Sequence, residues 1–344
     1  MDLPTVWFLL IAVLWIGYFV LEGFDFGVGM LLPVLGGSRY AADPADAEKR
    51  KRLMLTTIGP VWDGNEVWVL TAGGATFAAF PHWYATLFAG FYLPLLLILV
   101  ALIVRNLGFE YRGKGESQAW RDKWDLAIVV GSFVPALLWG VAFANIVVGV
   151  PIDASMEFTG NLLTLLNPVG LLGGLTTLGL FLTHGAVYLA LKTDGPIRAE
   201  ARALAWKIGL VTAALAVAFL ATVNVLTGNG ASWALSGLAA VALVGGLLGV
   251  RARREGWSFI ATALTIALAV AALFVALFPD VMPSSTNPAF SLTIHNASSS
   301  STTLSIMTVA ALVFTPIVLL YQGWTYWVFR KRLAVKHIPA ASHY

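Results

Sequence analysis

The chain has 344 residues, of which 58% are hydrophobic and only 11% are charged, whereas about a quarter of the residues in a soluble domain carry charge. This composition excludes an ordinary soluble domain. The net charge of +3 comes from short basic segments between apolar stretches, so it reflects membrane topology rather than nucleic-acid binding. The lack of cysteine excludes disulfides, thiolate metal sites and covalently attached haem.

Nine apolar stretches are long enough to cross a bilayer, whose core of about 30 Å needs roughly 20 helical residues. The first stretch follows Asp2 and Pro4 with no basic segment before it, so we expect a retained helix rather than a cleaved signal. The predicted spans are 5–34, 55–80, 82–105, 125–149, 162–191, 205–227, 233–250, 257–279 and 304–329.

The positive charges alternate strictly along the chain. All 21 Lys and Arg residues fall in every second connection or in the tail. These basic segments are 39–52, 105–123, 192–207, 251–254 and 330–336. Because cations in short loops stay on the cytoplasmic side, the pattern predicts nine crossings, with the N-terminus outside and the C-terminus in the cytoplasm.

Four carboxylates interrupt the first two spans: Glu22 and Asp25, then Asp63 and Glu66. Each pair is spaced i, i+3, so its members share one helix face. At the helical rise per residue, Asp25 lies about 15 Å before Leu35 and Asp63 about 16 Å after Arg52, so the two acids are at similar depth. Acids at membrane depth are costly and usually functional. Desolvation and like charge oppose ionisation of all four, so the group is suited to holding and passing protons.

Two alternatives remain open for these acids. If the second span is continuous through Gly59-Pro60, the proline loosens the backbone near Asp63 and makes room for water. If the helix instead begins at Pro60, Asp63 lies in its first turn, nearer the cytoplasm, and stabilises the helix N-terminus. Glu22 and Glu66 have a structural alternative, a hydrogen bond to a polar neighbour such as Asn65.

Histidine placement argues against a haem held by this chain alone. A membrane haem needs axial His or Met ligands, and His184 is the one histidine well inside a predicted span, since His82 lies at the outer edge of the third. We expect its ring to be hydrogen-bonded to a neighbouring helix. The other histidines and the methionines that form no clear ligand set with it are His82, His295, His337, His343, Met30, Met54, Met282 and Met307.

Several motifs resemble subunit II of the cytochrome bd quinol oxidases, in order from the first span to the last. They are Gly23-Phe24-Asp25-Phe26-Gly27-Val28-Gly29, Trp62-Asp63-Gly64-Asn65-Glu66-Val67-Trp68, Thr71-Ala72-Gly73-Gly74, Gly108-Phe109-Glu110-Tyr111-Arg112, Gly131-Ser132-Phe133-Val134-Pro135, and Phe278-Pro279 with Val281-Met282-Pro283-Ser284-Ser285-Thr286.

The resemblance implies one all-α membrane domain over 1–344, built as two four-helix bundles plus one extra helix. Helices 1–4 would occupy about 5–149, helices 5–8 about 162–279 and helix 9 about 304–329. It also implies a bacterial plasma-membrane complex that oxidises quinol and reduces dioxygen to water. In that complex the partner, subunit I, carries haem b and haem d, while this chain is a non-haem subunit that is not catalytic alone.

The resemblance also implies roles for individual acids. Asp63 matches the family's acid on a proton path toward subunit I, and Glu110 matches a carboxylate near its cytoplasmic mouth. Asp25 matches the acid of helix 1 and Glu22 its companion, although family members often carry Asp at the positions of Glu22 and Glu110. With Glu66, these residues form the predicted proton path, and no catalytic or metal-binding residue is assigned to this chain.

Two rival functions remain at this stage. One is a proton-coupled secondary transporter, although no pair of matching broken helices is found in the sequence. The other is a purely structural assembly subunit whose acids serve packing. The residues also leave open the quinone type, a bound structural quinone, a small third subunit, the oligomeric state and the role of His184.

Overall fold

The apolar stretches fold as long helices in the computed structural model, which describes residues 2–338. The long helices are α1 (Leu3–Leu35), α3 (Trp62–Ala79), α5 (Tyr92–Tyr111), α6 (Gln118–Val148), α8 (Pro168–Lys192), α9 (Pro196–Thr227), α10 (Gly230–Arg251), α11 (Glu255–Leu277) and α12 (Ser301–Val328). The shorter elements are α2 (Pro44–Ile58), α4 (Pro81–Gly90), α7 (Leu162–Leu165), the antiparallel strands β1 (Asp280–Met282) and β2 (Leu292–Thr293), and 3-10 turns at Arg112–Lys114, Pro288–Phe290 and Val335–His337.

Within residues 2–338, eight helices are long and apolar enough to cross a membrane: α1, α5, α6 and α8 to α12. The prediction of an all-α integral membrane protein is therefore confirmed. The ninth predicted crossing corresponds to α3, which has 18 residues and a length of about 27 Å. Asp63, Asn65 and Glu66 near its start lower its mean hydropathy, so a crossing by α3 stays a prediction.

The predicted second span, 55–80, is interrupted rather than continuous. Helix α2 ends at Ile58 and α3 begins at Trp62, because Pro60 has no N–H to continue the backbone ladder. The prediction of one continuous helix across this segment is wrong. The alternative prediction, a helix that begins near Pro60, agrees with the structure. Asp63 accordingly lies in the first turn of α3.

The predicted third span, 82–105, is also divided. A break at Phe91 separates α4 from α5, because Pro94 cannot donate to the carbonyl of residue 90. Helix α5 then continues to Tyr111, six residues beyond the predicted end. Arg105 therefore lies inside a helix and not in a loop.

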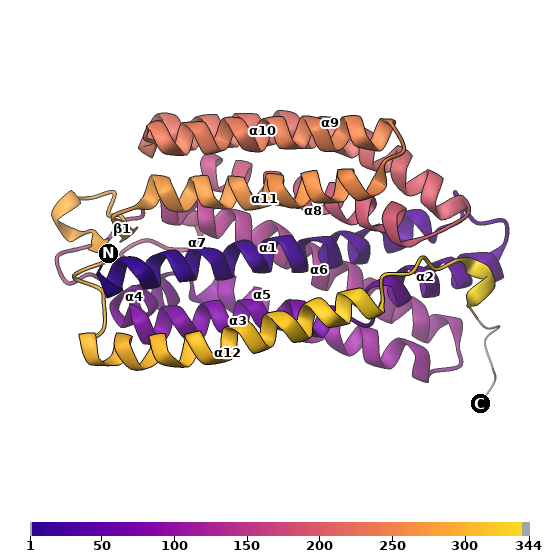
Figure 1. Ribbon diagram of the computed structural model, residues 1–344, viewed down its shortest axis with the longest axis horizontal. Helices are drawn as coiled ribbons and strands as arrows, with labels where there is room; N and C mark the ends of the chain where they lie inside the picture. Colours follow the sequence, from indigo (N-terminus) through magenta and orange to yellow (C-terminus); the bar gives the residue numbers. More distant parts are fainter. Residues whose placement is uncertain (1, 339–344) are drawn as a thin grey trace.

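Helices α1 and α8 occupy the middle of the molecule, with α9 and α10 along one long edge and α12 crossing the opposite edge (Figure 1). The two central helices touch through glycines: a Cβ added to Gly185 would lie 2.5 Å from the Cα of Gly27. Helix α12 is the most exposed candidate span, with only 6% of its apolar window buried.

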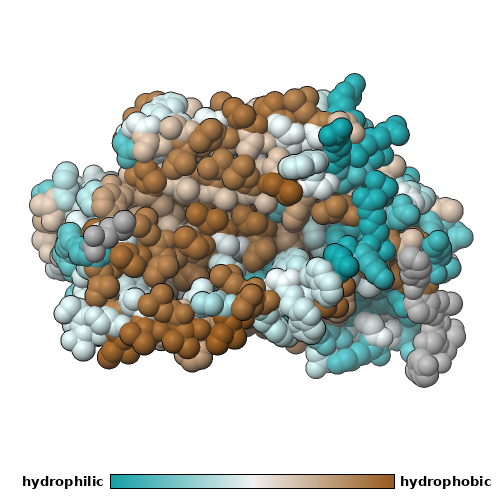
Figure 2. Space-filling model, in the orientation of Figure 1, coloured by the Kyte–Doolittle hydropathy of each residue, from teal (hydrophilic) through white to brown (hydrophobic). Residues whose placement is uncertain are grey.

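On the face shown in Figure 2, hydrophobic side chains cover the middle, and hydrophilic side chains gather most densely at one end. Ion pairs join the segments at this end: Arg50 with Glu200, Lys51 with Asp125 and Arg332 with Glu255. We call it the basic end, defined by residues 39–52, 112–123, 192–207, 251–254 and 330–336. Cations at one end of an apolar band are typical of a membrane protein.

Candidate functional site

The predicted acids of α1 and α3 differ sharply in exposure. Glu22 and Asp25 on α1 have no solvent exposure. The side chain of Glu66 on α3 is 14% exposed, and Asp63 is exposed at the start of the same helix. These acids therefore form a graded series from the surface to the interior instead of one enclosed group.

A fully buried arginine on α5 accompanies the acids. The Nη2 of Arg105 pairs with Oε1 of Glu22 and lies 3.3 Å from Oε2 of Glu66. Its guanidinium lies over the ring of Phe26, 4.6 Å from the centroid. A charge at this depth is tolerated only when it is paired.

Arg105 is thus not the loop cation that the charge pattern predicted. The sequence predicted no cation beside the acids, whereas in the structure Arg105 pairs with Glu22 and Glu66. The sequence did contain a sign that the helix extends past Arg105, because Leu107 and Phe109 continue the apolar run.

Asp25 is held by a separate set of contacts across three helices. Asn65 Nδ2 donates to Asp25 Oδ2 at 2.7 Å. The Oδ1 of Asn65 accepts from the hydroxyl of Tyr326 at 2.7 Å and from Nε2 of Gln322 at 3.2 Å, both on α12. Asn65 is therefore a hydrogen-bond donor to Asp25 and not to Glu22 or Glu66. The sequence reasoning missed Gln322 and Tyr326, although a glutamine inside an apolar span was a signal.

Several buried polar atoms of this cluster have no hydrogen-bond partner among the described residues. A buried polar atom normally has a partner, either from the protein or from ordered water. Hydrogen-bond capacity is therefore left unused on both the α1 acids and the α5 arginine. The atoms are Oε2 of Glu22, Oδ1 of Asp25, Nε and Nη1 of Arg105, and Oδ1 of Asn106.

The exposed acids Asp63 and Glu110 lie at the start of α3 and near the end of α5. The rings of Trp62 and Phe109 lie 5.2 Å apart, and Asp63 and Glu110 are their neighbours in sequence, both exposed. One turn deeper, Asn106 Nδ2 donates to Oε1 of Glu66 at 3.0 Å. These side-chain contacts hold Glu66 beside α5, and they place Asp63 and Glu110 next in sequence to a contacting pair of rings.

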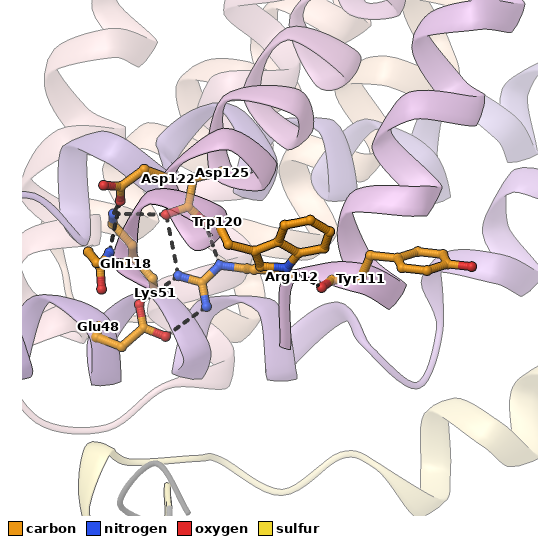
Figure 3. A network of polar contacts seen from close by, with 8 residues as sticks. All are labelled: Glu48, Lys51, Tyr111, Arg112, Gln118, Trp120, Asp122 and Asp125. Atoms are coloured by element: carbon orange, nitrogen blue, oxygen red, sulfur yellow. Dashed lines mark hydrogen bonds and ion pairs between the residues drawn. The ribbon is translucent and has the colours of Figure 1, made fainter. Parts of the chain in front are cut away.

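An ion-pair network at the basic end anchors the end of α5 beside Glu110. Figure 3 shows Arg112 between Glu48 of α2 and Asp125 of α6. The two Nη atoms of Arg112 lie 2.8 and 2.7 Å from the carboxylate of Glu48, and Lys51 lies 2.9 Å from Asp125. This network joins three helices and limits the movement of the segment that carries Glu110.

His184 is fully buried and hydrogen-bonded on both sides. Its Nδ1 lies 2.7 Å from the hydroxyl of Thr262 on α11, and its Nε2 lies 3.2 Å from the carbonyl of Val20 on α1. The predicted hydrogen bond to a neighbouring helix is confirmed. Because both ring nitrogens are engaged, His184 does not fit a haem iron, and the described residues hold no cluster of metal-ligating acids and histidines.

The family model for cytochrome bd terminal oxidase subunit II matches residues 3–329. The chain belongs to this family. Subunit II of cytochrome bd is an integral membrane component of a bacterial terminal oxidase, so the membership decides against the transporter alternative. It also implies a subunit I as partner and haem in the assembled complex.

Curated relatives of this subunit II extend over almost the whole chain. It is 41% identical to cytochrome bd ubiquinol oxidase subunit 2 of Bacillus subtilis (strain 168), covering 97% of this chain and 98% of the relative. It is 39% identical to cytochrome bd-I ubiquinol oxidase subunit 2 of Escherichia coli (strain K12), covering 99% and 98%.

A solved structure supports the subunit II fold. A chain of the bd oxidase from Geobacillus thermodenitrificans aligns with a TM-score of 0.77 at 18% identity, covering 96% of this chain and 100% of that one. At this identity the likeness shows the fold alone. The individual roles of the acids therefore rest on the geometry described above.

Proposed function

We propose that this subunit II conducts protons from the cytoplasm toward a haem-bearing subunit I and supports that subunit in the membrane. The complex would oxidise quinol and reduce dioxygen to water, with haem b and haem d held by subunit I. The engaged nitrogens of His184 support haem binding by the partner rather than by this chain.

The observation that carries the proposal is the graded series of acids. Asp63 and Glu110 offer exposed carboxylates, Glu66 lies between surface and interior, and Glu22 and Asp25 are buried. Arg105 and Asn65 bind the inner members. Carboxylates spaced through polar contacts, with unused hydrogen-bond capacity beside them, suit proton transfer through side chains and water.

The proposed topology has nine crossings in one membrane domain. The first four crossings, within about 5–149, form one bundle, the next four, within about 162–279, form the second, and α12 is the extra helix. The N-terminus would be outside and the C-terminus cytoplasmic. The gathering of cations at the basic end supports this orientation. The length of α3, about 27 Å, is close to the hydrocarbon thickness.

We propose that subunit I covers the face formed by α3 and α12. An exposed carboxylate such as Asp63 is costly against lipid, and α12 presents many uncovered apolar side chains, including Leu312, Leu320 and Trp324. Contact with a protein partner there would shield Asp63 from lipid.

Asp63→Asn tests the proton path. Because an amide neither binds nor releases a proton, oxygen consumption by the purified complex is expected to fall about tenfold or more. Haem content, measured from the visible spectrum, is expected to stay normal. The matched control is Glu116→Gln, which removes an exposed carboxylate at the same end outside the series. Full turnover of the Asp63→Asn complex would favour the purely structural alternative.

Glu110→Gln is expected to slow oxygen consumption less than Asp63→Asn does. Glu110 is exposed, so water and nearby loop groups can deliver protons in its place. Oxygen uptake and haem absorbance of the two variants should be measured side by side. Loss of assembled haem in Glu110→Gln would assign this residue to structure and contradict a role at the mouth of the path.

A cavity of about 250 Å³ between α9–α10 and the central helices is lined almost entirely by apolar side chains. Such a lining suits hydrocarbon but offers little to hold the polar head of a quinone.

A further inference from the structure

Four exposed cations lie at the ends of α9, α10 and α11 that reach the basic end. Lys207 is on α9, Arg251 ends α10, and Arg253 and Arg254 lie in the turn before α11. We call these four residues the basic ledge. Within residues 2–338 none of them has a carboxylate partner, and Arg251 instead lies over the ring of Trp206, 5.5 Å from its centroid.

The nearest acid cannot neutralise the ledge. Glu255 is already shared by Arg198 at 3.1 Å, Arg202 at 2.9 Å and Arg332 at 3.7 Å. Three arginines therefore share this carboxylate, although Arg198 also lies 3.7 Å from Asp194. Beside them, the four cations of the ledge have no carboxylate partner among the described residues. The region carries an excess of positive charge that calls for an anion from outside the chain.

The ledge lies at the depth of phospholipid phosphates. Helices α9 and α10 form a hairpin that turns at Gly228 and Asn229. Counting from that turn, Lys207 and Arg251 each lie about 30 Å along their helices, which is one hydrocarbon thickness. The contact between Trp206 and Arg251 shows that the two helices keep this register.

Exposed apolar side chains lead from the membrane interior to the ledge. On α10 they are Val241, Val244 and Leu248, spaced on one helix face. On α11, Ile260 is 56% exposed and Trp257 is 68% exposed. A shallow hollow at their end is lined by Arg254, Glu255, Gly256, Trp257 and Ile260, which combines a cation with an interfacial tryptophan.

Arg253 occupies a backbone position that favours glycine. Its φ of 58° is left-handed, and its N–H donates to Val250 while the N–H of Arg254 donates to Gly249, closing the end of α10. Glycine is the usual residue at such a helix end because it has no Cβ to clash. An arginine here costs stability, so its side chain calls for a role of its own.

We propose that the basic ledge binds the phosphate of an anionic phospholipid, whose acyl chains lie along the exposed apolar faces of α10 and α11. Charge complementarity selects an anionic over a zwitterionic lipid. The depth of the ledge and the exposed Trp257 favour a membrane lipid over a soluble phosphate. This inference needs only that the helices cross a membrane and is independent of the proton path.

The test measures which lipids contact Trp257 in the purified complex. The complex is placed in phosphatidylcholine nanodiscs that contain a small fraction of either brominated phosphatidylglycerol or brominated phosphatidylcholine. The difference in fluorescence between the parent and Trp257→Phe isolates Trp257. Stronger quenching by the brominated anionic lipid is the expected result, and equal quenching by the two lipids would overturn the proposal.

Three variants sharpen the test. Arg253→Gly is expected to weaken the preference for the anionic lipid about fivefold, the usual loss for one cation near a membrane surface, without lowering thermal stability in detergent. Arg251→Gln with Arg254→Gln should weaken it further. Lys123→Gln, which removes an exposed cation of α6 at the same end, is expected to leave the preference unchanged.

Two further outcomes would overturn the proposal. If Lys123→Gln weakens the preference as much as Arg253→Gly does, the effect is a general surface potential and the ledge is not a site. If inorganic phosphate abolishes the preference while chloride at the same ionic strength leaves it unchanged, the ledge is a site for free anions rather than for lipid. An unchanged preference in phosphate supports the proposal.

Discussion

Replacement of Arg105 by methionine is expected to prevent stable assembly of the oxidase. The variant leaves Glu22 buried without its cation and removes one of two partners of Glu66. Breaking a buried ion pair by removing one partner costs about 3–5 kcal/mol, a large part of the stability of most proteins. Haem absorbance retained on heating, measured in detergent-purified complex, gives the readout.

Two further variants separate charge from packing at this position. Arg105→Lys keeps the charge but not the planar fork that reaches two acids, so it should recover only part of the stability. Combining Arg105→Met with Glu22→Gln should also recover part, because the buried acid loses its charge together with its partner. A stable Arg105→Met complex with normal haem would contradict the role assigned to this arginine.

Gly185→Ala is the second change with a large expected effect. The added methyl would lie 2.5 Å from Cα of Gly27 and 2.7 Å from the backbone nitrogen of Val28. These are backbone atoms, so α1 and α8 must move apart, and overpacking of this kind costs about 1–3 kcal/mol or more. A lower yield of assembled complex and a lower midpoint of thermal unfolding are expected.

The matched control for this change is Gly245→Ala. Gly245 lies inside α10 with nothing within 4 Å of an added Cβ, so alanine should be neutral or stabilise the helix by up to about 1 kcal/mol. Equal thermal stability of the two variants would show that the contact between α1 and α8 is not closely packed.

The acids could be found from sequence, but their partners could not. Glu22, Asp25, Asp63 and Glu66 stand out because carboxylates are rare in apolar spans. Arg105 stood at the edge of a basic loop in the sequence, and only the continuation of α5 to Tyr111 brought it inside. Its pairing with Glu22 joins residues 83 positions apart, a contact that no local pattern encodes.

The contrast between Asp63 and Asp25 has the same origin. Both lie on apolar helices at similar predicted depth, yet one is exposed and the other fully buried. Asp25 faces the α1–α3–α12 contact, where Asn65 and Tyr326 meet. Asp63 lies at the free start of α3, which the break at Pro60 created.

By itself the sequence determined a helical membrane protein, its basic end, its acids and its family, because a bilayer core demands long apolar helices and excludes loose cations. Tertiary structure decided which acid is buried, which cation pairs with it and where α3 begins. Those outcomes depend on which faces of distant helices come into contact, and that is a property of the packed bundle rather than of any one segment.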